Sequence, residues 1–333
     1  KRHKGFAPNA EIVIVKGGNN SFPTDNTIKS LTYFQNVATA LNKPIVVNYT
    51  IGGQGTHKDG LESHEIAMDN FASAPGRVVV VAAGNDGAQP AHKKIELEPI
   101  KIDAYDDSKD SGDFTIRVKS ITGTTAGTLA TYNFLINSDS IVGVTVKGPD
   151  GKEVEYDFNI NHTLAASFLD NSYRAVVQSL VLAQNNKRRV IFQLQRIENP
   201  TITDAAGDYT ISFKNKSNKS IAIDGYRMTS IGISNIVGAD NHYMVSSPGN
   251  STEAITVANY NGRERWFSSY NGGNYSVPTS TQGFEGIVDS SNEGPRLDGV
   301  LKPEIAASGS MVVSSRSADA PIIDDDLPLI ADN

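Results

Sequence analysis

The stretch VVVVAAGNDG (Val78 to Gly87) joins a run of four valines to a glycine-rich turn. A run that is apolar throughout, and does not alternate with polar residues, is typical of a strand buried on both faces of a parallel sheet. The earlier run IVVNY (Ile45 to Tyr49) is also mainly apolar, and it leads into the first of two glycine-rich turns, Ile51 to Gly55. The two runs therefore predict two buried strands of one parallel sheet.

Amphipathic segments separate the apolar runs. Apolar residues recur at spacings of three and four from Ile28 to Leu41, which predicts a helix that ends before Pro44. A second helix is expected from Leu61 to Phe71, and the run IVIVK (Ile12 to Lys16) predicts a further buried strand. This alternation of strands and helices predicts an α/β fold, a parallel sheet with helices on both faces.

The middle of the chain, from about residue 91 to residue 245, has a different pattern. Short segments there alternate apolar and polar residues, as antiparallel strands with one buried face do. The turn Gly148 to Gly151 joins two of them, and Leu164 to Leu182 is the one long helical candidate. The regular spacing predicts an antiparallel β-sandwich, jelly-roll-like. Its expected strands are 114–118, 132–136, 142–146, 154–158, 190–194, 209–213 and 221–226.

The α/β pattern returns after Val245, with one expected strand at 254–257 and a second at 303–307 followed by 311–313. The sandwich is therefore expected to be inserted into the α/β domain. The expected division is a first α/β part at 1–91, the inserted sandwich at 92–245 and a second α/β part at 246–333.

Composition excludes several classes of function. The chain has 333 residues, with 30 Lys plus Arg against 37 Asp plus Glu and a formal charge of −7, so it lacks the basic surplus of a nucleic-acid-binding protein. It has no cysteine, which excludes thiol catalysis and Cys-ligated metal sites. Its longest apolar run, Val78 to Ala83, is too short to span a membrane. The chain opens on Lys1 without a signal sequence, so we expect a processed or cut start.

The two glycine-rich turns are the first places to look for a site, because open parallel sheets bind ligands at the carboxyl ends of their strands. In the second turn, the side-chain amide of Asn85 could donate a hydrogen bond to a developing oxyanion. The alternative is that Gly84 to Gly87 is only a turn, since Asn, Asp and Gly favour turns for conformational reasons.

Several strings, in order along the chain, resemble the subtilisin-like serine protease family, the subtilases. The resemblance covers both α/β parts and leaves out the sandwich. The strings are GFAPNAEIVIVK (Gly5 to Lys16), VVNYTIGG (Val46 to Gly53), VVVVAAGNDG (Val78 to Gly87), SPGNSTEAITVANY (Ser247 to Tyr260), FSS (Phe267 to Ser269) and GPRLDGVLKPEIAASG (Gly294 to Gly309).

This resemblance implies a serine endopeptidase that acts on polypeptides and is secreted or held in the cell envelope. It implies that Asn85 is the oxyanion-hole residue. Substrate would be bound between two segments, Thr50, Ile51 and Gly52 on one side and Ala82, Ala83 and Gly84 on the other. The loop GTHKDG (Gly55 to Gly60) is similar to that of the clostridial Csp-type branch, whose members carry a jelly roll inserted between the oxyanion Asn and the catalytic Ser.

The chain departs from the family at the catalytic triad, because the segments that carry the Asp, His and Ser motifs are not found in it. His57 follows the string VVNYTIGG (Val46 to Gly53), whereas the resemblance implies that the catalytic His should precede Gly5, so His57 is interpreted as a loop residue. Ser268 and Ser310 lack the nucleophile's sequence context. The chain is therefore expected to be a fragment that is inactive alone.

Three alternative functions remain open. The protein could be a non-catalytic pseudoprotease, or its sandwich could bind a glycan or a partner protein; a purely structural sandwich is a third possibility. No cofactor is expected, although Asp324, Asp325 and Asp326 could ligate Ca²⁺ if they are not simply a solvated turn. The basic cluster Lys187 to Arg189 is expected to decorate a hairpin and not to bind phosphate. The oligomeric state is left open.

Overall fold

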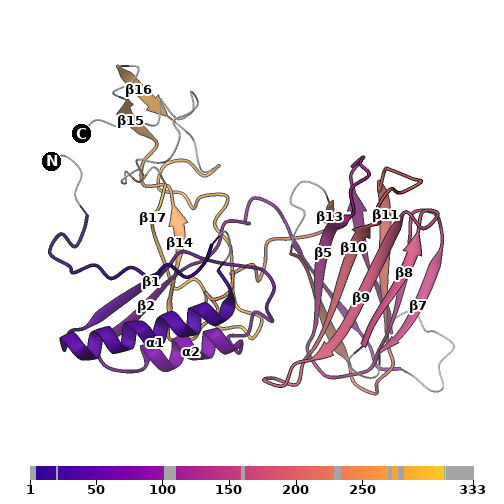
Figure 1. The fold of residues 1–333 in the computed structure, drawn as a ribbon, viewed down its shortest axis with the longest axis horizontal. Helices are drawn as coiled ribbons and strands as arrows, with labels where there is room; N and C mark the ends of the chain where they lie inside the picture. Colours follow the sequence, from indigo (N-terminus) through magenta and orange to yellow (C-terminus); the bar gives the residue numbers. More distant parts are fainter. Residues whose placement is uncertain are drawn as a thin grey trace.

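Figure 1 shows a part that holds two helices and a parallel sheet beside a second part built from long antiparallel strands. The structure is a computed structural model. It describes residues 5–19, 22–100, 110–158, 162–228, 234–268, 272–276, 281–310 and 312. Within these ranges, neither helix is long and apolar enough to cross a membrane.

The parallel sheet has four strands in the order β1-β2-β14-β17. Every neighbouring pair in it is parallel. The chain leaves the sheet after β2 and returns to it at β14, as the two separated α/β patterns predict. The strands are β1 (Ile45–Tyr49), β2 (Arg77–Ala82), β14 (Ile255–Tyr260) and β17 (Ile305–Ser308).

Two helices pack on this sheet, α1 (Thr24–Leu41) and α2 (Ser63–Ala72). Helix α1 ends at Asn42, whose left-handed conformation closes it two residues before the proline. The first turn of α2 is held by a capping box between Glu62 and Glu65. Both predicted helices are therefore present, and local hydrogen bonds mark the end of α1 and the start of α2.

The helices cover one face of the sheet, not both. They contact each other, and their apolar sides form one core with the inward side chains of β1 and β2. On the opposite face, Val46 is 68% exposed and Val78 and Ile255 are each 37% exposed. In the described ranges, the expectation of helices on both faces is thus met on one face only. The core residues are Leu31, Val47, Tyr49, Met68, Phe71, Val79, Val81 and Ala254.

The predicted strand Ile12 to Lys16 is wrong. These residues have no regular secondary structure, and Ile12 and Ile14 are 82% and 84% exposed. A strand is stable only when a neighbour satisfies its backbone groups, and this segment pairs with none of the described strands. Its apolar residues therefore gain no burial.

The second part consists of two antiparallel sheets that share one large apolar core. All seven strands predicted for this region are present, as β4 to β7 and β10 to β12. The six-stranded sheet contains, in order, β3 (His92–Leu97), β12 (Ile221–Arg227), β5 (Gly127–Ile136), β10 (Arg188–Arg196), β9 (Tyr173–Val181) and β8 (His162–Phe168). The five-stranded sheet contains β13 (Ser234–Ile236), β4 (Ser111–Val118), β11 (Gly207–Asn215), β6 (Val142–Lys147) and β7 (Glu153–Phe158).

The helical candidate Leu164 to Leu182 is wrong as well, because it forms the hairpin of β8 and β9. Leu169, Asp170 and Asn171 have φ angles of 50°, 53° and 60°, and this left-handed turn reverses the chain where a helix would continue. Along β9, buried and less buried residues alternate. Every second side chain therefore faces the core, as in a strand.

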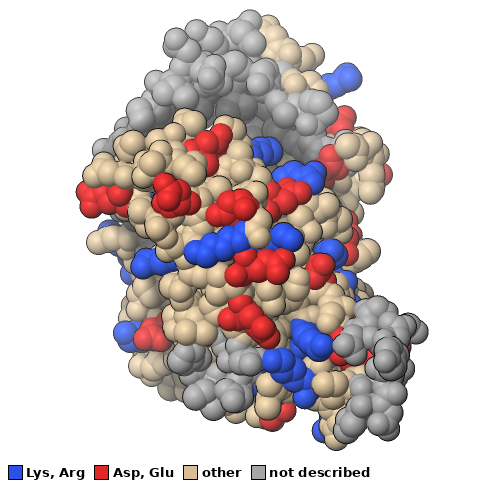
Figure 2. Space-filling model, turned by 90° about the vertical axis from the view of Figure 1, so that its right-hand side faces the viewer, with Lys and Arg blue, Asp and Glu red and all other residues tan. Residues whose placement is uncertain are grey.

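The surface of the sandwich mixes both signs of charge. On the face shown in Figure 2, acidic and basic side chains are interspersed. Pairs such as Arg117 with Asp208 and Lys147 with Glu153 lie on exposed sites, where ion pairs contribute little to stability.

A short hairpin of β15 (Arg265–Ser268) and β16 (Gly273–Ser276) completes the described elements. Several residues singled out from the sequence fall outside the described ranges: Lys1, Ser269, Met311, Val313 and Asp324 to Asp326.

Candidate functional site

The carboxyl ends of β1 and β2 lie side by side, because the parallel register places Tyr49 opposite Val81. The turns that follow both strands therefore start at the same edge of the sheet. Thr50 and Gly52 in the first turn are exposed, and Ile51 is half-buried. The sequence-predicted site is thus brought together from segments that are about thirty residues apart.

On the β2 side, Ala82 and Gly84 are half-buried, Ala83 is buried and Asn85 is exposed. The backbone of Ala83 is already paired: its N–H donates to Val257 at 3.0 Å, and its carbonyl accepts from Ser246 at 2.8 Å. This segment is fixed as a wall, and its last residue, Asn85, projects from it.

The side-chain amide of Asn85 has no hydrogen-bond partner among the described residues. Its neighbour Asp86, in contrast, accepts a hydrogen bond from Gln54 at 2.8 Å. Asn85 is therefore an exposed donor on an otherwise well-bonded turn.

Gly84 shows why this turn needs glycine. Its φ angle is +114°, a conformation that L side chains rarely adopt. A Cβ at this position would lie 2.2 Å from Nδ2 of Asn292 and 2.4 Å from Oγ of Ser246. Because these two side chains approach so closely, only glycine fits at this position.

Asn292 holds the turn in place, and sequence reasoning missed it. Its Oδ1 accepts from the backbone N–H of Asp86 at 2.6 Å, and its own N–H donates to the carbonyl of Gly84 at 3.2 Å. Its Nδ2 donates to Met244 O at 2.9 Å and to Ser246 Oγ at 3.0 Å. No local signal could identify this residue, because it lies 206 positions from Asp86.

The buried side chain of Lys58 stabilises the turn of Gly84 to Gly87 through Gln54. Lys58 is fully buried, and its ammonium donates to Gln54 Oε1 at 2.5 Å and to Val245 O at 2.9 Å. Burial lowers the pKa of Lys58 to about 7, although the charges of Glu65 and Asp86 oppose the shift. Gln54 connects Lys58 to Asp86, so the first glycine-rich turn and the second share one polar network.

The first turn is anchored through Ser247. Gly53 and Ser247 exchange two backbone hydrogen bonds of 3.0 Å and 2.9 Å. The hydroxyl of Ser247 donates to Glu65 Oε1 at 2.6 Å and lies 2.7 Å from Nε2 of His64. This is not a catalytic triad, because all three side chains are buried and the carboxylate contacts the serine instead of orienting the histidine. Burial raises the pKa of Glu65 to about 7, against the Ser247 hydrogen bond that lowers it.

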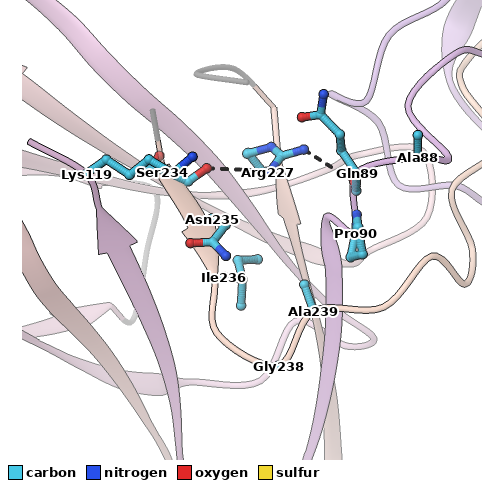
Figure 3. Close-up of a pocket in the computed structure, with 10 residues that line it drawn as sticks. All are labelled: Ala88, Gln89, Pro90, Lys119, Arg227, Ser234, Asn235, Ile236, Gly238 and Ala239. Atoms are coloured by element: carbon cyan, nitrogen blue, oxygen red, sulfur yellow. Dashed lines mark hydrogen bonds between the residues drawn. The ribbon is translucent and has the colours of Figure 1, made fainter. Parts of the chain in front are cut away.

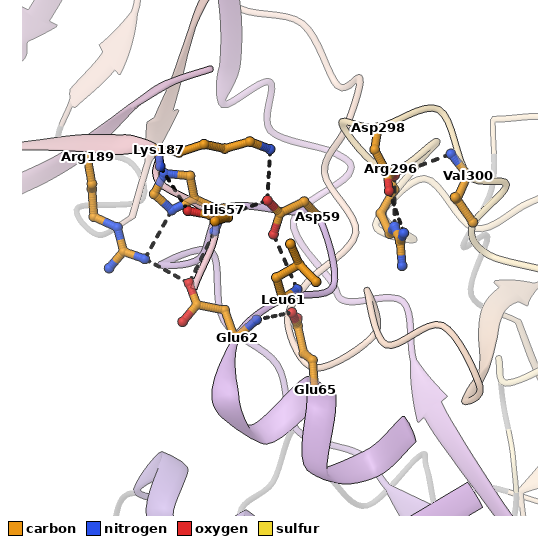
Figure 4. Close-up of polar contacts among 11 residues, drawn as sticks. His57, Asp59, Leu61, Glu62, Glu65, Lys187, Arg189, Arg296, Asp298 and Val300 are labelled. Atoms are coloured by element: carbon orange, nitrogen blue, oxygen red, sulfur yellow. Dashed lines mark hydrogen bonds and ion pairs between the residues drawn. The ribbon is translucent and has the colours of Figure 1, made fainter. Parts of the chain in front are cut away.

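His57 lies at the junction between the two parts of the molecule (Figure 4). It is 1% exposed, and its Nδ1 is 3.5 Å from Nη2 of Arg189. Burial, reinforced by the positive charge of Arg189, lowers the pKa of His57 to about 4. The interpretation of His57 as a loop residue agrees with this position, which is closed to substrate.

The basic cluster Lys187 to Arg189 lies at the β9–β10 hairpin, as expected, and two of its side chains also form ion pairs with the other part of the molecule. Lys187 pairs with Asp59 at 2.8 Å and Arg189 with Glu62 at 2.8 Å, and both acids belong to the α/β part (Figure 4). The hairpin is thereby fastened to the loop that follows the candidate site.

The remaining candidates add no further chemistry. In the described ranges, no three His, Asp or Glu side chains cluster to hold a metal ion. Ser310 is buried.

Comparison with known proteins gives a family and a fold. A sequence model of the subtilase family, peptidase S8, matches residues 1–225 and 174–325. Among solved structures, the Clostridium perfringens CspB protease superposes with a TM-score of 0.67 at 16% sequence identity. The alignment covers 90% of this chain and 55% of the protease, so the chain spans about half the length of that protein. A search of curated proteins found no match.

Proposed function

Because the chain belongs to the subtilase family, we propose that it forms part of a serine endopeptidase that hydrolyses peptide bonds by Ser-His-Asp acyl transfer. The proposed organisation is a subtilisin-like domain, residues 1–91 and 246–333, that is interrupted by a jelly-roll-like sandwich at 92–245. The return of the chain to the parallel sheet at β14 supports this division. A secreted or cell-envelope location is proposed with it.

The substrate is an extended polypeptide that lies along Thr50 to Gly52. This segment continues β1, which is an edge strand of the described sheet, and Thr50 and Gly52 are exposed. Backbone pairing with such an edge supplies affinity without sequence selectivity. The side chain before the scissile bond would lie between Thr50 to Gly52 and the wall of Ala82 to Gly84.

The single observation that carries the proposal is the unpartnered amide of Asn85 beside that edge. When a serine hydroxyl attacks the scissile carbonyl, a histidine takes its proton and negative charge develops on the carbonyl oxygen. An amide donor held at this point stabilises the charge more in the transition state than in the ground state. The rigid support of Gly84 and Asp86 by Asn292 keeps Asn85 in position beforehand.

The three triad motifs are not found in the chain, so we propose that residues 1–333 alone do not turn over peptides. The test compares this chain with the whole protein that contains it, on a panel of fluorogenic peptides. The whole protein should cleave, and Asn85→Ala should lower its kcat by about 10²–10³-fold. This is the effect of losing the corresponding asparagine donor in subtilisin.

Asn70→Ala is the matched control, because Asn70 is an exposed amide on α2, away from the two turns. Cleavage by the chain alone that persists after repurification would contradict the proposed inactivity. A whole protein that binds peptides but never cleaves them would favour the pseudoprotease.

A further inference from the structure

A cavity of about 380 Å³ lies where the connection after β2 enters the sandwich (Figure 3). Gln89 and Pro90 of the connection form one wall. The opposite wall comes from the ends of β4, β12 and β13, through Lys119, Arg227 and Asn235. None of these residues belongs to the proposed peptide site, so the cavity requires a separate explanation.

Arg227 is the central feature of this cavity. Its side chain lines the space, yet the residue is only 6% exposed. Its backbone is fixed, because its N–H donates to Ala91 O at 2.9 Å. A permanently charged group is thus held rigidly at the wall of a cavity that is partly open to solvent.

The guanidinium of Arg227 is poorly satisfied. It donates to Ser234 O at 3.5 Å and to Gln89 O at 3.3 Å, both longer than the usual 2.9–3.0 Å of such bonds. A guanidinium has five N–H donors. Among the described residues no carboxylate lies within ion-pair distance of it, and the sequence from Met228 to Ser234 contains no acid.

Arg188 provides a contrast within the same sandwich. It is also buried, with no carboxylate within ion-pair distance in the described ranges, but it makes three hydrogen bonds of 2.8–3.1 Å, to Ser179 Oγ and to two backbone carbonyls. Its charge is solvated by fixed protein dipoles. The charge of Arg227 lacks an equivalent set of acceptors and faces a cavity instead.

We propose that this cavity binds a small organic carboxylate, with Arg227 as its anchor. The planar fork of a guanidinium matches a planar carboxylate in a bidentate pair. The exposed Ala88 and Pro90 offer apolar surface for a carbon skeleton, and the exposed Asn235 and Gln89 offer amide groups for its polar substituents. Lys119, on the exposed rim, adds a second positive charge. The volume suits a ligand the size of a sugar acid or an acylated amino acid.

The test uses the chain labelled with ¹⁵N at arginine, titrated with sodium glucuronate and with N-acetyl-alanine. Inorganic phosphate and sulfate are titrated for comparison, as oxyanions that are not carboxylates. The Arg227 Nε–H resonance, assigned by its loss in Arg227→Lys, should shift saturably with at least one of the two carboxylates. Arg227→Gln should weaken that binding by about 10- to 100-fold.

Arg227→Gln could disturb folding, so Lys119→Gln provides a second variant at an exposed position. It should weaken binding about two- to fivefold. Arg117→Gln is the matched control, because Arg117 is an exposed cation on β4, the strand that Lys119 follows. This substitution should leave carboxylate binding unchanged. The proposal is overturned if neither carboxylate gives a saturable shift, or if Arg117→Gln weakens binding as much as Lys119→Gln. Tighter binding of phosphate or sulfate than of both carboxylates would overturn the assigned ligand class.

Discussion

The ammonium of Lys187 lies 2.8 Å from Oδ2 of Asp59, although the two residues are 128 positions apart in the sequence. Asp59 is 4% exposed and also accepts from Asn185 at 2.9 Å. An ion pair therefore connects the loop of Asp59 in the α/β part to the β9–β10 hairpin of the sandwich. Because Asp59 is buried, solvent screens this pair only weakly.

Loss of this pair should destabilise the fold. Lys187→Ala removes the cation from a buried carboxylate and leaves it only the side chain of Asn185 and the backbone N–H of Leu61 as donors, at an expected cost of about 1–3 kcal/mol in the free energy of unfolding. Lys147→Ala is the control, because its pair with Glu153 is exposed and should contribute about 0–1 kcal/mol. Urea unfolding monitored by circular dichroism measures both. Equal effects of the two substitutions would show that the junction does not depend on this pair.

Gly84→Ala should destabilise the turn that carries Asn85. The added Cβ meets Asn292 and Ser246 in a backbone conformation that alanine rarely adopts, and we expect a loss of about 1–3 kcal/mol. Gly53→Ala is the control, since Gly53 lies at the end of the other turn, with no atom within 4 Å of an added Cβ. Thermal unfolding of both variants at one pH compares them. A Gly84→Ala variant as stable as Gly53→Ala would contradict the packing described for Gly84.

His57 should make the protein sensitive to acid. Its pKa is lowered to about 4 in the folded state, against about 6.5 when unfolded. Between these values only the unfolded state takes up a proton, so stability falls as the pH drops from about 6.5 to about 4, by up to about 3 kcal/mol.

In His57→Gln this part of the acid sensitivity should disappear. The measurement is the free energy of unfolding at several pH values from 4 to 8, with the exposed His242→Gln as control. If the pH profile of His57→Gln has the wild-type slope, the buried imidazole does not titrate as expected.

Glu65 should have the opposite effect. Burial raises its folded-state pKa to about 7, so from about 4.5 to about 7 the unfolded state ionises while the folded state keeps its proton. Stability contributed by this group is therefore full below pH 4.5 and lost as the pH rises towards 7.

Glu65→Gln mimics the protonated side chain and cannot titrate. Relative to the wild type, it should become more stable as the pH rises through this window, whereas the exposed Glu198→Gln should keep a constant difference. A constant difference for Glu65→Gln as well would show that Glu65 is ionised throughout.

Much of the fold could be predicted because the patterns involved are local. Each pattern reflects how a single element buries its apolar side chains. The examples are the apolar runs of β1 and β2, the three-and-four spacing of α1 and the alternation along the sandwich strands. The site turns followed from the same patterns, since parallel strands that end in glycine-rich turns bring those turns to one edge.

The errors arose where a segment's state depends on a partner. Ile12 to Lys16 has a strand's composition but no described strand to pair with, and Leu164 to Leu182 has apolar residues that suit either period. The left-handed turn at Leu169 to Asn171 and the packing of β9 against β10 selected the hairpin. Propensity is weaker than such tertiary contacts, so it could not decide these cases.

The sequence by itself determined the family, the α/β and antiparallel elements and the place of Asn85, because these depend on residue order and short-range periodicity. Only the tertiary structure decided that Asn292 braces the turn, that Lys187 and Arg189 are fastened to Asp59 and Glu62, and that Arg227 faces a cavity. These contacts join residues far apart in the chain. The energy of an ion pair or a hydrogen bond depends on the distance between its two groups and on how far water is excluded from them. Folding alone sets both.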